Sequence, residues 1–279
     1  MLKQRTIDVI NYHITSICNY HCQYCFVGFQ ERMATKETAF KIVEEIHKFF
    51  IKSGVKDGRI NFAGGEPLLY PYLTDVIEHA NSLGLKASII TNGSLLTEEM
   101  ISNWKGKVET IGISIDANSD RTNCVIGREQ NGKVLSKEQL LKIADCIHKN
   151  GIKLKVNTVV SKLNLNENML AIYKNVKPDR LKFLYMHVIE NINSEANKLK
   201  PTSKEFESFV ARNHYEYANE VIAEAEGSMQ NSYLMISPDG NVFLNENGKG
   251  KTYGNCLEQD LYGIFAGLPF DNKKYNLRY

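Results

Sequence analysis

The stretch at residues 18–25, Cys-Asn-Tyr-His-Cys-Gln-Tyr-Cys, places three of the six cysteines of the chain on one short segment. Immediately before it, Val9–Thr15 alternates apolar and polar side chains, which is typical of a β-strand. Three thiolates on a short loop can bind three irons of a [4Fe–4S] cube, which leaves the fourth iron for a small chelating molecule. We therefore expect Cys18, Cys22 and Cys25 to bind such a cluster at the end of the first strand.

Two other interpretations of the cysteines are weaker. Structural zinc takes four closed ligands, commonly two well-separated pairs, and His21 is a poor fourth ligand because it adjoins Cys22. Three unrelated buried thiols would not be expected to lie so close together in the sequence. The cluster therefore remains the favoured hypothesis.

The overall composition is that of an ordinary globular protein. The 279 residues are 43% hydrophobic and 24% charged, and no run approaches the ~18 apolar residues that a membrane span needs. The net charge of +2, from 34 basic and 32 acidic residues, leaves no bulk basic footprint for nucleic acid. We expect a cytoplasmic monomer that contacts neither a membrane nor nucleic acid directly.

Strand and helix patterns alternate through the first two thirds of the chain. After Val9–Thr15, further β-rich runs lie at residues 59–62, 87–91, 110–115, 154–160 and 181–188, with helical patterns between them. Such alternation predicts an α/β fold with a parallel sheet and helices outside. Six strand–helix units predict a partial (βα)6 TIM-type barrel over residues 1–190, short of the usual eight.

The pattern changes after residue 190. We expect a loop at 191–201, a helix that starts at the capping box of Thr202 and Glu205 and runs to about residue 225, and a hairpin around Asp239 and Gly240. The Gly-, Asn- and Lys-rich stretch 245–279 is expected to be mobile. Residues 191–279 are thus predicted to form an α+β extension that packs on the barrel and covers the substrate site, within one structural domain.

The polar faces of the predicted strands carry cations where a scaffold barrel would carry branched apolar side chains. Arg59, Lys155, Arg180 and Lys182 fall on these faces, and few carboxylates accompany them. Buried unpaired cations are costly, so partners or water must be present. We expect a wet cavity for a polar, anionic ligand, the alternative being that the cations reach solvent at strand ends.

A second motif joins the cysteines. Gly64-Gly65-Glu66-Pro67 ends the second predicted strand, Thr91-Asn92-Gly93 ends the third, and Ser114 lies on the fourth. Together with the cysteine loop, these motifs resemble the radical SAM superfamily. The resemblance implies that S-adenosylmethionine binds at Gly64, Gly65, Glu66, Thr91, Asn92, Ser114 and Arg128.

Within that superfamily the chain resembles the viperins over nearly all its length. The segments that carry the resemblance are Asn11-Tyr12-His13, Asn61-Phe62-Ala63, Ile126-Gly127-Arg128, Lys155-Val156-Asn157, Arg180-Leu181-Lys182 and Asn231-Ser232-Tyr233-Leu234. The resemblance implies a lyase that converts a ribonucleoside triphosphate to its 3′-deoxy-3′,4′-didehydro analogue, a terminator of viral RNA chains. A 5′-deoxyadenosyl radical would take the C4′ hydrogen of the ribose, and the 3′-hydroxyl would leave as water.

The same resemblance implies the substrate contacts and partners. The nucleotide would bind at Asn11, Arg59, Asn61, Lys155, Asn157, Arg180 and Lys182, mostly through phosphate, with Tyr233 near the ribose as a candidate hydrogen donor. Arg59 stands where viperins usually carry Lys. CTP is the favoured nucleotide, with UTP and GTP as alternatives, and a flavodoxin or ferredoxin would supply electrons.

Two competing functions remain at this point. Another radical SAM enzyme of nucleotide or cofactor metabolism is one, although relatives that need a second cluster are disfavoured because only Cys256 follows Cys146. An iron–sulfur electron carrier is the other. Carriers normally supply four ligands and have no need of the Gly-Gly-Glu-Pro motif or of a polar barrel.

Overall fold

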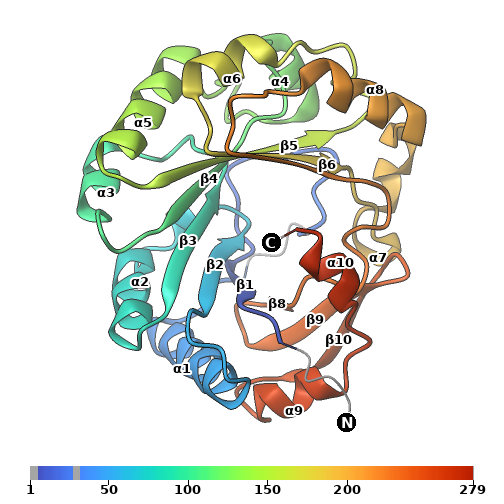
Figure 1. Cartoon of the computed structure of the whole chain (residues 1–279). Helices are drawn as coiled ribbons and strands as arrows, with labels where there is room; N and C mark the ends of the chain where they lie inside the picture. Colours follow the sequence, from blue (N-terminus) through green and yellow to red (C-terminus); the bar gives the residue numbers. More distant parts are fainter. Residues whose placement is uncertain (1–5, 28–31, 279) are drawn as a thin grey trace.

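The computed structural model describes residues 6–27 and 32–278, which form one curved ten-stranded sheet with the strand order β10-β9-β8-β1-β2-β3-β4-β5-β6-β7. Figure 1 shows the strands as an incomplete ring with most of the helices outside it. Since β7 and β10 are the edges among the described strands, the α/β architecture is a partial barrel, as predicted.

The first six strands are parallel and coincide with the six predicted runs, although the sixth ends earlier, at Tyr185. Their bounds are β1 Val9–Thr15, β2 Arg59–Gly64, β3 Lys86–Thr91, β4 Thr110–Ser114, β5 Lys153–Val160 and β6 Arg180–Tyr185. Parallel strands end at one edge of a sheet, so the loops after β1–β6 meet at one mouth of the barrel.

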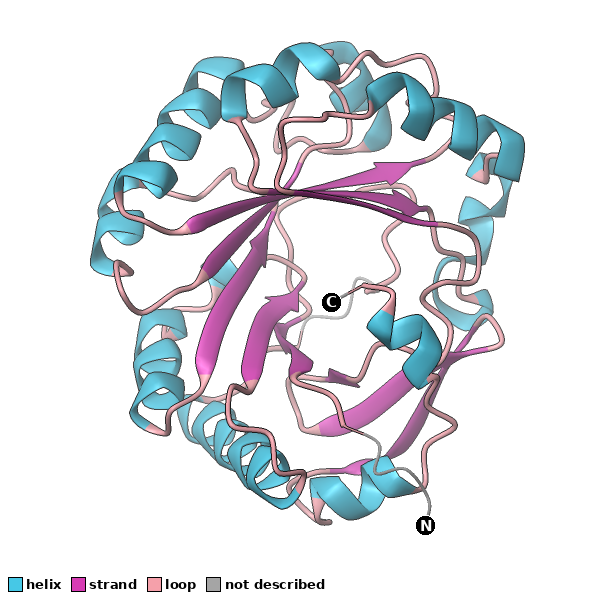
Figure 2. Cartoon of the chain, in the orientation of Figure 1, coloured by secondary structure: helices cyan, strands magenta, loops and turns pink. Residues whose placement is uncertain are grey.

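Amphipathic helices cover the outer face of these strands (Figure 2). They are α1 Lys36–Lys52, α2 Leu73–Ser82, α3 Glu98–Asn103, α4 Asp120–Ile126, α5 Lys137–Lys149 and α6 Leu170–Val176, with a 3₁₀ turn, η1, at Pro67–Leu69. In α1, Ile42, Ile46 and Phe49 are fully buried against the apolar face of the sheet. The apolar positions of the strands thus face the helices, and the polar positions face the interior.

The C-terminal third departs from the sequence-based expectations in three places. Residues 191–201 are not an open loop, because α7 (Glu190–Asn193) and the 3₁₀ helix η2 (Ser194–Leu199) occupy them. The helix that starts at the predicted capping box, α8 (Ser203–Asn213), ends well before residue 225. A seventh parallel strand, β7 (Glu220–Glu224), follows it and pairs with β6.

The predicted hairpin is present, and the tail beyond it is folded. β8 (Met235–Ile236) pairs in parallel with β1 and antiparallel with β9 (Asn241–Glu246). The stretch that was expected to be mobile contains β10 (Lys249–Asn255), α9 (Leu261–Ala266) and α10 (Asn272–Asn276). Figure 1 shows α10 within the ring of strands.

Two hydrogen-bonding residues fix the position of α10. The Tyr275 hydroxyl accepts from the backbone N–H of Val9 at 3.0 Å, and Arg278, which is 2% exposed, donates to the carbonyl of Ser232 at 2.8 Å. The Arg278 carbonyl in turn accepts from Arg180 at the start of β6. The tail therefore covers the amino ends of the strands, opposite the cysteine loop.

Every helix within residues 6–27 and 32–278 is too short or too polar to span a lipid bilayer.

Candidate active site

The cysteine loop is held on one side by the Gly-Gly-Glu-Pro segment. The backbone N–H groups of Gly65 and Glu66 donate to the carbonyls of Thr15 and Ile17, at 2.7 and 2.8 Å. A Cβ atom at Gly64, where φ is +125°, would lie 2.0 Å from the Thr15 oxygen, and one at Gly65 would lie 2.2 Å from the Ile17 oxygen. The glycines are thus needed for close contact between this segment and the chain that leads into Cys18.

The Ile126-Gly127-Arg128 segment holds the other side of the loop. His21 donates its backbone N–H to the Gly127 carbonyl at 3.1 Å, and Gln23 donates to the Ile126 carbonyl at 2.9 Å. A Cβ atom at Gly127, where φ is +86°, would lie 2.3 Å from the His21 oxygen. Three motifs that are far apart in the sequence therefore form one rigid unit around the cysteines.

A cavity of about 270 Å³ opens beside this unit and extends into the barrel. Fifteen of the predicted site residues line it: Asn11, Cys18, Cys22, Cys25, Asn61, Gly64, Gly65, Thr91, Asn92, Ser114, Arg128, Lys155, Asn157, Lys182 and Tyr233. The predicted motifs thus converge on one space.

The three cysteines of the loop, Cys18, Cys22 and Cys25, all line the cavity. Among the described residues, no three His, Cys, Asp or Glu side chains converge closely enough to hold one metal ion. Burial raises the pKa of Cys18 and of Cys22 to about 11. Iron must therefore displace the thiol protons when it binds.

Glu66 is the one predicted S-adenosylmethionine residue that the cavity lining does not include. Its carboxylate is fully buried and accepts from the Thr91 hydroxyl and the Asn92 N–H, both at 2.7 Å, and from the Leu68 N–H at 3.1 Å. Burial raises the pKa of Glu66, although these donors oppose the shift. The carboxylate ties the loops after β2 and β3 together, so that the neighbouring backbone and Asn92 face the cavity.

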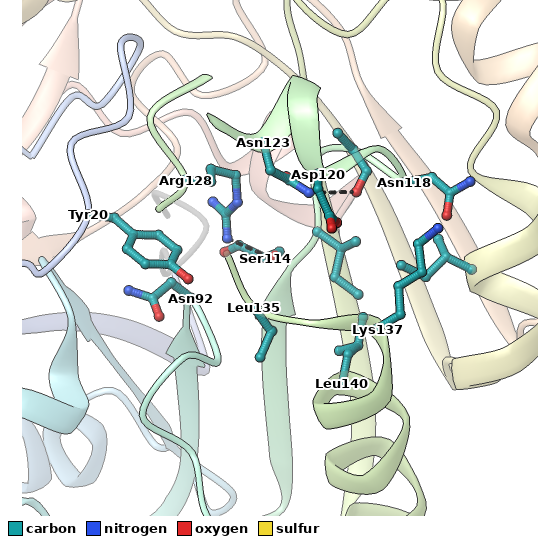
Figure 3. Close-up of a pocket in the computed structure, with 13 residues that line it drawn as sticks. Tyr20, Asn92, Ser114, Asn118, Asp120, Asn123, Arg128, Leu135, Lys137 and Leu140 are labelled. Atoms are coloured by element: carbon teal, nitrogen blue, oxygen red, sulfur yellow. Dashed lines mark hydrogen bonds between the residues drawn. The ribbon is translucent and has the colours of Figure 1, made fainter. Parts of the chain in front are cut away.

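Arg128 lies beside the cysteine loop, with its Nη1 4.0 Å from Cys22 Sγ. Its Nη2 donates to the Ser114 carbonyl at 2.6 Å, and Nη1 lies 2.9 Å from the Asp116 carboxylate. Figure 3 shows Arg128 pointing towards Ser114, with Tyr20 and Asn92 beside it, at a small side pocket of about 30 Å³. Burial disfavours the guanidinium charge and is the largest single effect, but Asp116 together with Cys22, Tyr24 and Tyr20 outweighs it and raises the pKa of Arg128. A permanent cation therefore faces the cavity next to the cysteines.

Two lysines line the cavity, and they differ in whether a carboxylate pairs with them. Lys182 Nζ lies 2.7 Å from a Glu224 oxygen, and both side chains are almost fully buried. Of the residues that the structure describes, no carboxylate pairs with Lys155. Burial, together with the nearby Lys182 and Arg180 cations, lowers the pKa of Lys155 well below its usual value. The charged form of Lys155 is thus the one on this wall that an anionic ligand would stabilise most.

Arg59 and Arg180 lie at the amino ends of β2 and β6 and do not line the cavity beside the cysteine loop, which we call the upper cavity. They line a second cavity of about 230 Å³, the lower cavity, which shares Asn61 and Lys155 with the upper one. Arg59 pairs with Glu109 at 3.1 Å, and Arg180 pairs with Glu220 at 2.7 Å. The expectation that few carboxylates accompany these cations is therefore wrong, because Glu109, which immediately precedes β4, and Glu220, which begins β7, lie beside them.

Sequence reasoning missed three buried charged residues at this site: Asp116, Glu224 and Arg278. Glu224 accepts from the Tyr233 hydroxyl at 2.8 Å, and the Arg278 guanidinium lies 3.7 Å from the centre of the Tyr233 ring. Glu224 falls in the stretch expected to be helical and Arg278 in the stretch expected to be mobile. Only the strand parity of residues 220–224 could have shown that Glu224 faces the interior.

Comparison with known proteins gives the class. The sequence profile described as "Radical SAM superfamily" matches residues 12–174. The solved structure of SuiB from Streptococcus suis bound to S-adenosylmethionine aligns with 96% of this chain and 67% of its own, with a TM-score of 0.67 at 18% identity, which shows the same fold. The chain belongs to the radical SAM superfamily, and the predicted cofactors of that class, a [4Fe–4S] cluster and S-adenosylmethionine, are confirmed.

Closer relatives give the family. An S-adenosylmethionine-dependent nucleotide dehydratase of Flammeovirga pacifica is 31% identical over 96% of this chain and 93% of its own length. One of Selenomonas ruminantium is 32% identical over 97% of this chain and 98% of its own. Within the superfamily, the chain belongs to the viperin family of nucleotide dehydratases.

Proposed function

We propose that the chain dehydrates a ribonucleoside triphosphate, CTP in preference to UTP or GTP, to its 3′-deoxy-3′,4′-didehydro analogue. The observation that carries this proposal is the continuity between the cysteine loop and the cationic interior. The cavity that contains Cys18, Cys22 and Cys25 also contains Lys155 and Lys182. A triphosphate carries the negative charge that such an interior would bind.

The cofactor end of the cavity is assigned to Gly64, Gly65, Thr91, Asn92, Ser114 and Arg128. The permanent cation of Arg128 suits the carboxylate of S-adenosylmethionine, since charge-assisted hydrogen bonds are the strong kind. Glu66 would contribute indirectly, because it holds in place the loops after β2 and β3 that line this end of the cavity. When bound, the cluster and S-adenosylmethionine supply the one-electron chemistry that removes a hydrogen atom from the ribose. A flavodoxin or ferredoxin would supply the electrons.

The substrate end is assigned to Asn11, Asn61, Lys155, Asn157 and Lys182, with Arg59 and Arg180 beyond them in the lower cavity. Asn157 is 6% exposed, and its Oδ1 lacks a hydrogen-bond partner among the described residues, so a ligand N–H or O–H could satisfy it. The Tyr233 hydroxyl, oriented by Glu224, is proposed to lie near the ribose as a hydrogen donor.

An anaerobic turnover panel with CTP, UTP, GTP and ATP tests the proposal. The reconstituted enzyme is expected to form 5′-deoxyadenosine together with a nucleotide lighter by one water, most rapidly from CTP. The product should then stop extension by a viral RNA polymerase. Cleavage of S-adenosylmethionine without dehydration of any of the four would favour another radical SAM reaction of nucleotide or cofactor metabolism. The cytoplasmic location, the monomeric state and the division of the chain at residue 190 stay predictions.

A further inference from the structure

Asp116 lies two residues beyond β4, and its side chain is completely buried at the wall of the upper cavity. A buried carboxylate is retained only where charges and hydrogen bonds compensate its desolvation. Asp116 Oδ1 accepts from the backbone N–H of Val159 at 2.6 Å, and Oδ2 accepts from the Tyr24 hydroxyl at 2.6 Å. One carboxylate thus connects β5 to the cysteine loop.

The third contact of Asp116 is with Arg128, whose Nη1 lies 2.9 Å from Oδ2. The same Nη1 lies 4.0 Å from Cys22 Sγ. A line of alternating charge therefore runs from the sulfur of a proposed cluster ligand through Arg128 to Asp116. Because all three groups are in a poorly hydrated region, their charges act on one another more strongly than they would in water.

We infer that the Asp116 carboxylate, through its ion pair with Arg128, offsets the positive charge beside Cys22 and so lowers the reduction potential of the cluster bound there. Net charge and contacts to the ligand sulfurs are among the factors that set the potential of an iron–sulfur cluster. Arg128 alone would favour the added electron, and the Asp116 carboxylate offsets that effect. The inference rests on the proposed cluster ligation by Cys22 and is independent of the nucleotide.

The test compares the midpoint potentials of reconstituted native protein and two variants, at equal iron content and without nucleotide. Asp116→Asn removes the charge, whereas Glu167→Gln is the matched control. The Glu167 carboxylate also accepts several hydrogen bonds, but from the start of α4 and the residues just before it, at 2.9 Å from the Asn118 N–H and 2.6 Å from the Thr122 hydroxyl. The potential is expected to shift to a more positive value in D116N and to stay at the native value in E167Q.

An unchanged potential in fully loaded D116N, or an equal shift in E167Q, would overturn the inference. If D116N does not take up the cluster, the difference in midpoint potential between Arg128→Met and the D116N/R128M double variant measures the effect of the same Asp116 charge. R128M is expected to have a more negative potential than the native protein, and the double variant a more positive one than R128M. Equal potentials for R128M and the double variant would reduce Asp116 to a purely structural residue.

Discussion

Lys182 and Glu224 form an ion pair of 2.7 Å inside the barrel, with 1% and 3% of their side-chain surfaces exposed. Tyr233 and Arg278 share the same carboxylate. Burial is the largest single effect and would raise the pKa of Glu224, but the Lys182 and Arg278 charges and the hydrogen bonds from Lys182 and Tyr233 together outweigh it and lower the pKa. The proposed phosphate site is thus partly neutralised before a nucleotide arrives, and a triphosphate has to share Lys182 with Glu224.

Replacing Glu224 with Gln should destabilise the free protein. Two buried cations would lose their counter-charge, and breaking a buried pair in this way costs about 3–5 kcal/mol of unfolding free energy. Added CTP would restore negative charge, so it should raise the unfolding temperature of E224Q more than that of the native protein. Thermal unfolding with and without CTP measures both effects.

The control for this experiment is Glu45→Gln, which breaks the exposed pair with Lys48 on α1. Exposed pairs contribute little, so its unfolding temperature should equal that of the native protein. If E224Q is as stable as the native protein, the buried pair contributes nothing to stability.

Replacing Cys22 with Ala should abolish the cluster and S-adenosylmethionine cleavage, because a cube bound by only two protein thiolates is not retained. Iron content and 5′-deoxyadenosine formation after anaerobic reconstitution measure the two losses. Cys124→Ala provides the matched control, since Cys124 is exposed on α4 and lies outside the cavity lining. Continued cleavage in the Cys22 variant would refute the assigned site.

The first six strands and the interior placement of Asn11, Asn61 and Lys155 could be predicted because side chains alternate regularly along a strand. Strand β7 could not. Three of the five residues of β7, namely Glu220, Ala223 and Glu224, are good helix formers, and its strand conformation comes from pairing with β6. Tertiary pairing overrides weak local propensity.

The motifs of the site were predictable for a similar reason, since each is a short local pattern. The charge partners were not. Lys182 and Glu224 are 42 positions apart in the sequence, and Tyr24 and Asp116 are 92 apart. Nothing local to Asp116 signals a buried carboxylate, and at Glu224 the only signal is the side-chain alternation of a strand that was itself not predicted. Each carboxylate is satisfied by donors that only the fold brings near.

His13 predicts how the stability of the fold depends on pH. Burial lowers its pKa from 6.5 to about 4, so the unfolded chain takes up a proton before the native one does as the pH falls. Stability from this residue is complete above pH 6.5 and is lost progressively down to about pH 4. At 1.36 kcal/mol per unit, the loss approaches about 3 kcal/mol.

Urea unfolding at pH 7, 5.5 and 4.5 checks this dependence. His13→Gln removes the titrating ring, so its unfolding free energy should fall less steeply over this range than that of the native protein. Equal slopes for the two proteins would show that other groups account for the acid sensitivity. The His187 ring, whose pKa burial also lowers to about 4, should leave some slope in the variant.

The Lys155 side chain is expected to lower the unfolding free energy of the free protein and to raise its affinity for the nucleotide. Its pKa lies well below the usual value, first because of burial and then because of Lys182 and Arg180. The unfolded chain therefore binds this proton more readily at neutral pH, and folding is opposed by the partly buried cation. A triphosphate would supply the missing counter-charge, so ligand binding and stability should respond to Lys155 in opposite directions.

Replacing Lys155 with Met, which has a similar length and no charge, should therefore raise the unfolding temperature of the free protein. It should also weaken CTP binding by roughly tenfold or more, the value of one charge-assisted hydrogen bond, and leave S-adenosylmethionine binding nearly unchanged. Calorimetric titration with each ligand measures the difference. Lys149→Met on the exposed face of α5, where 74% of the side chain is accessible, should change none of these quantities. Equal weakening of both ligands would contradict a phosphate contact, because Lys155 would then act on the whole cavity.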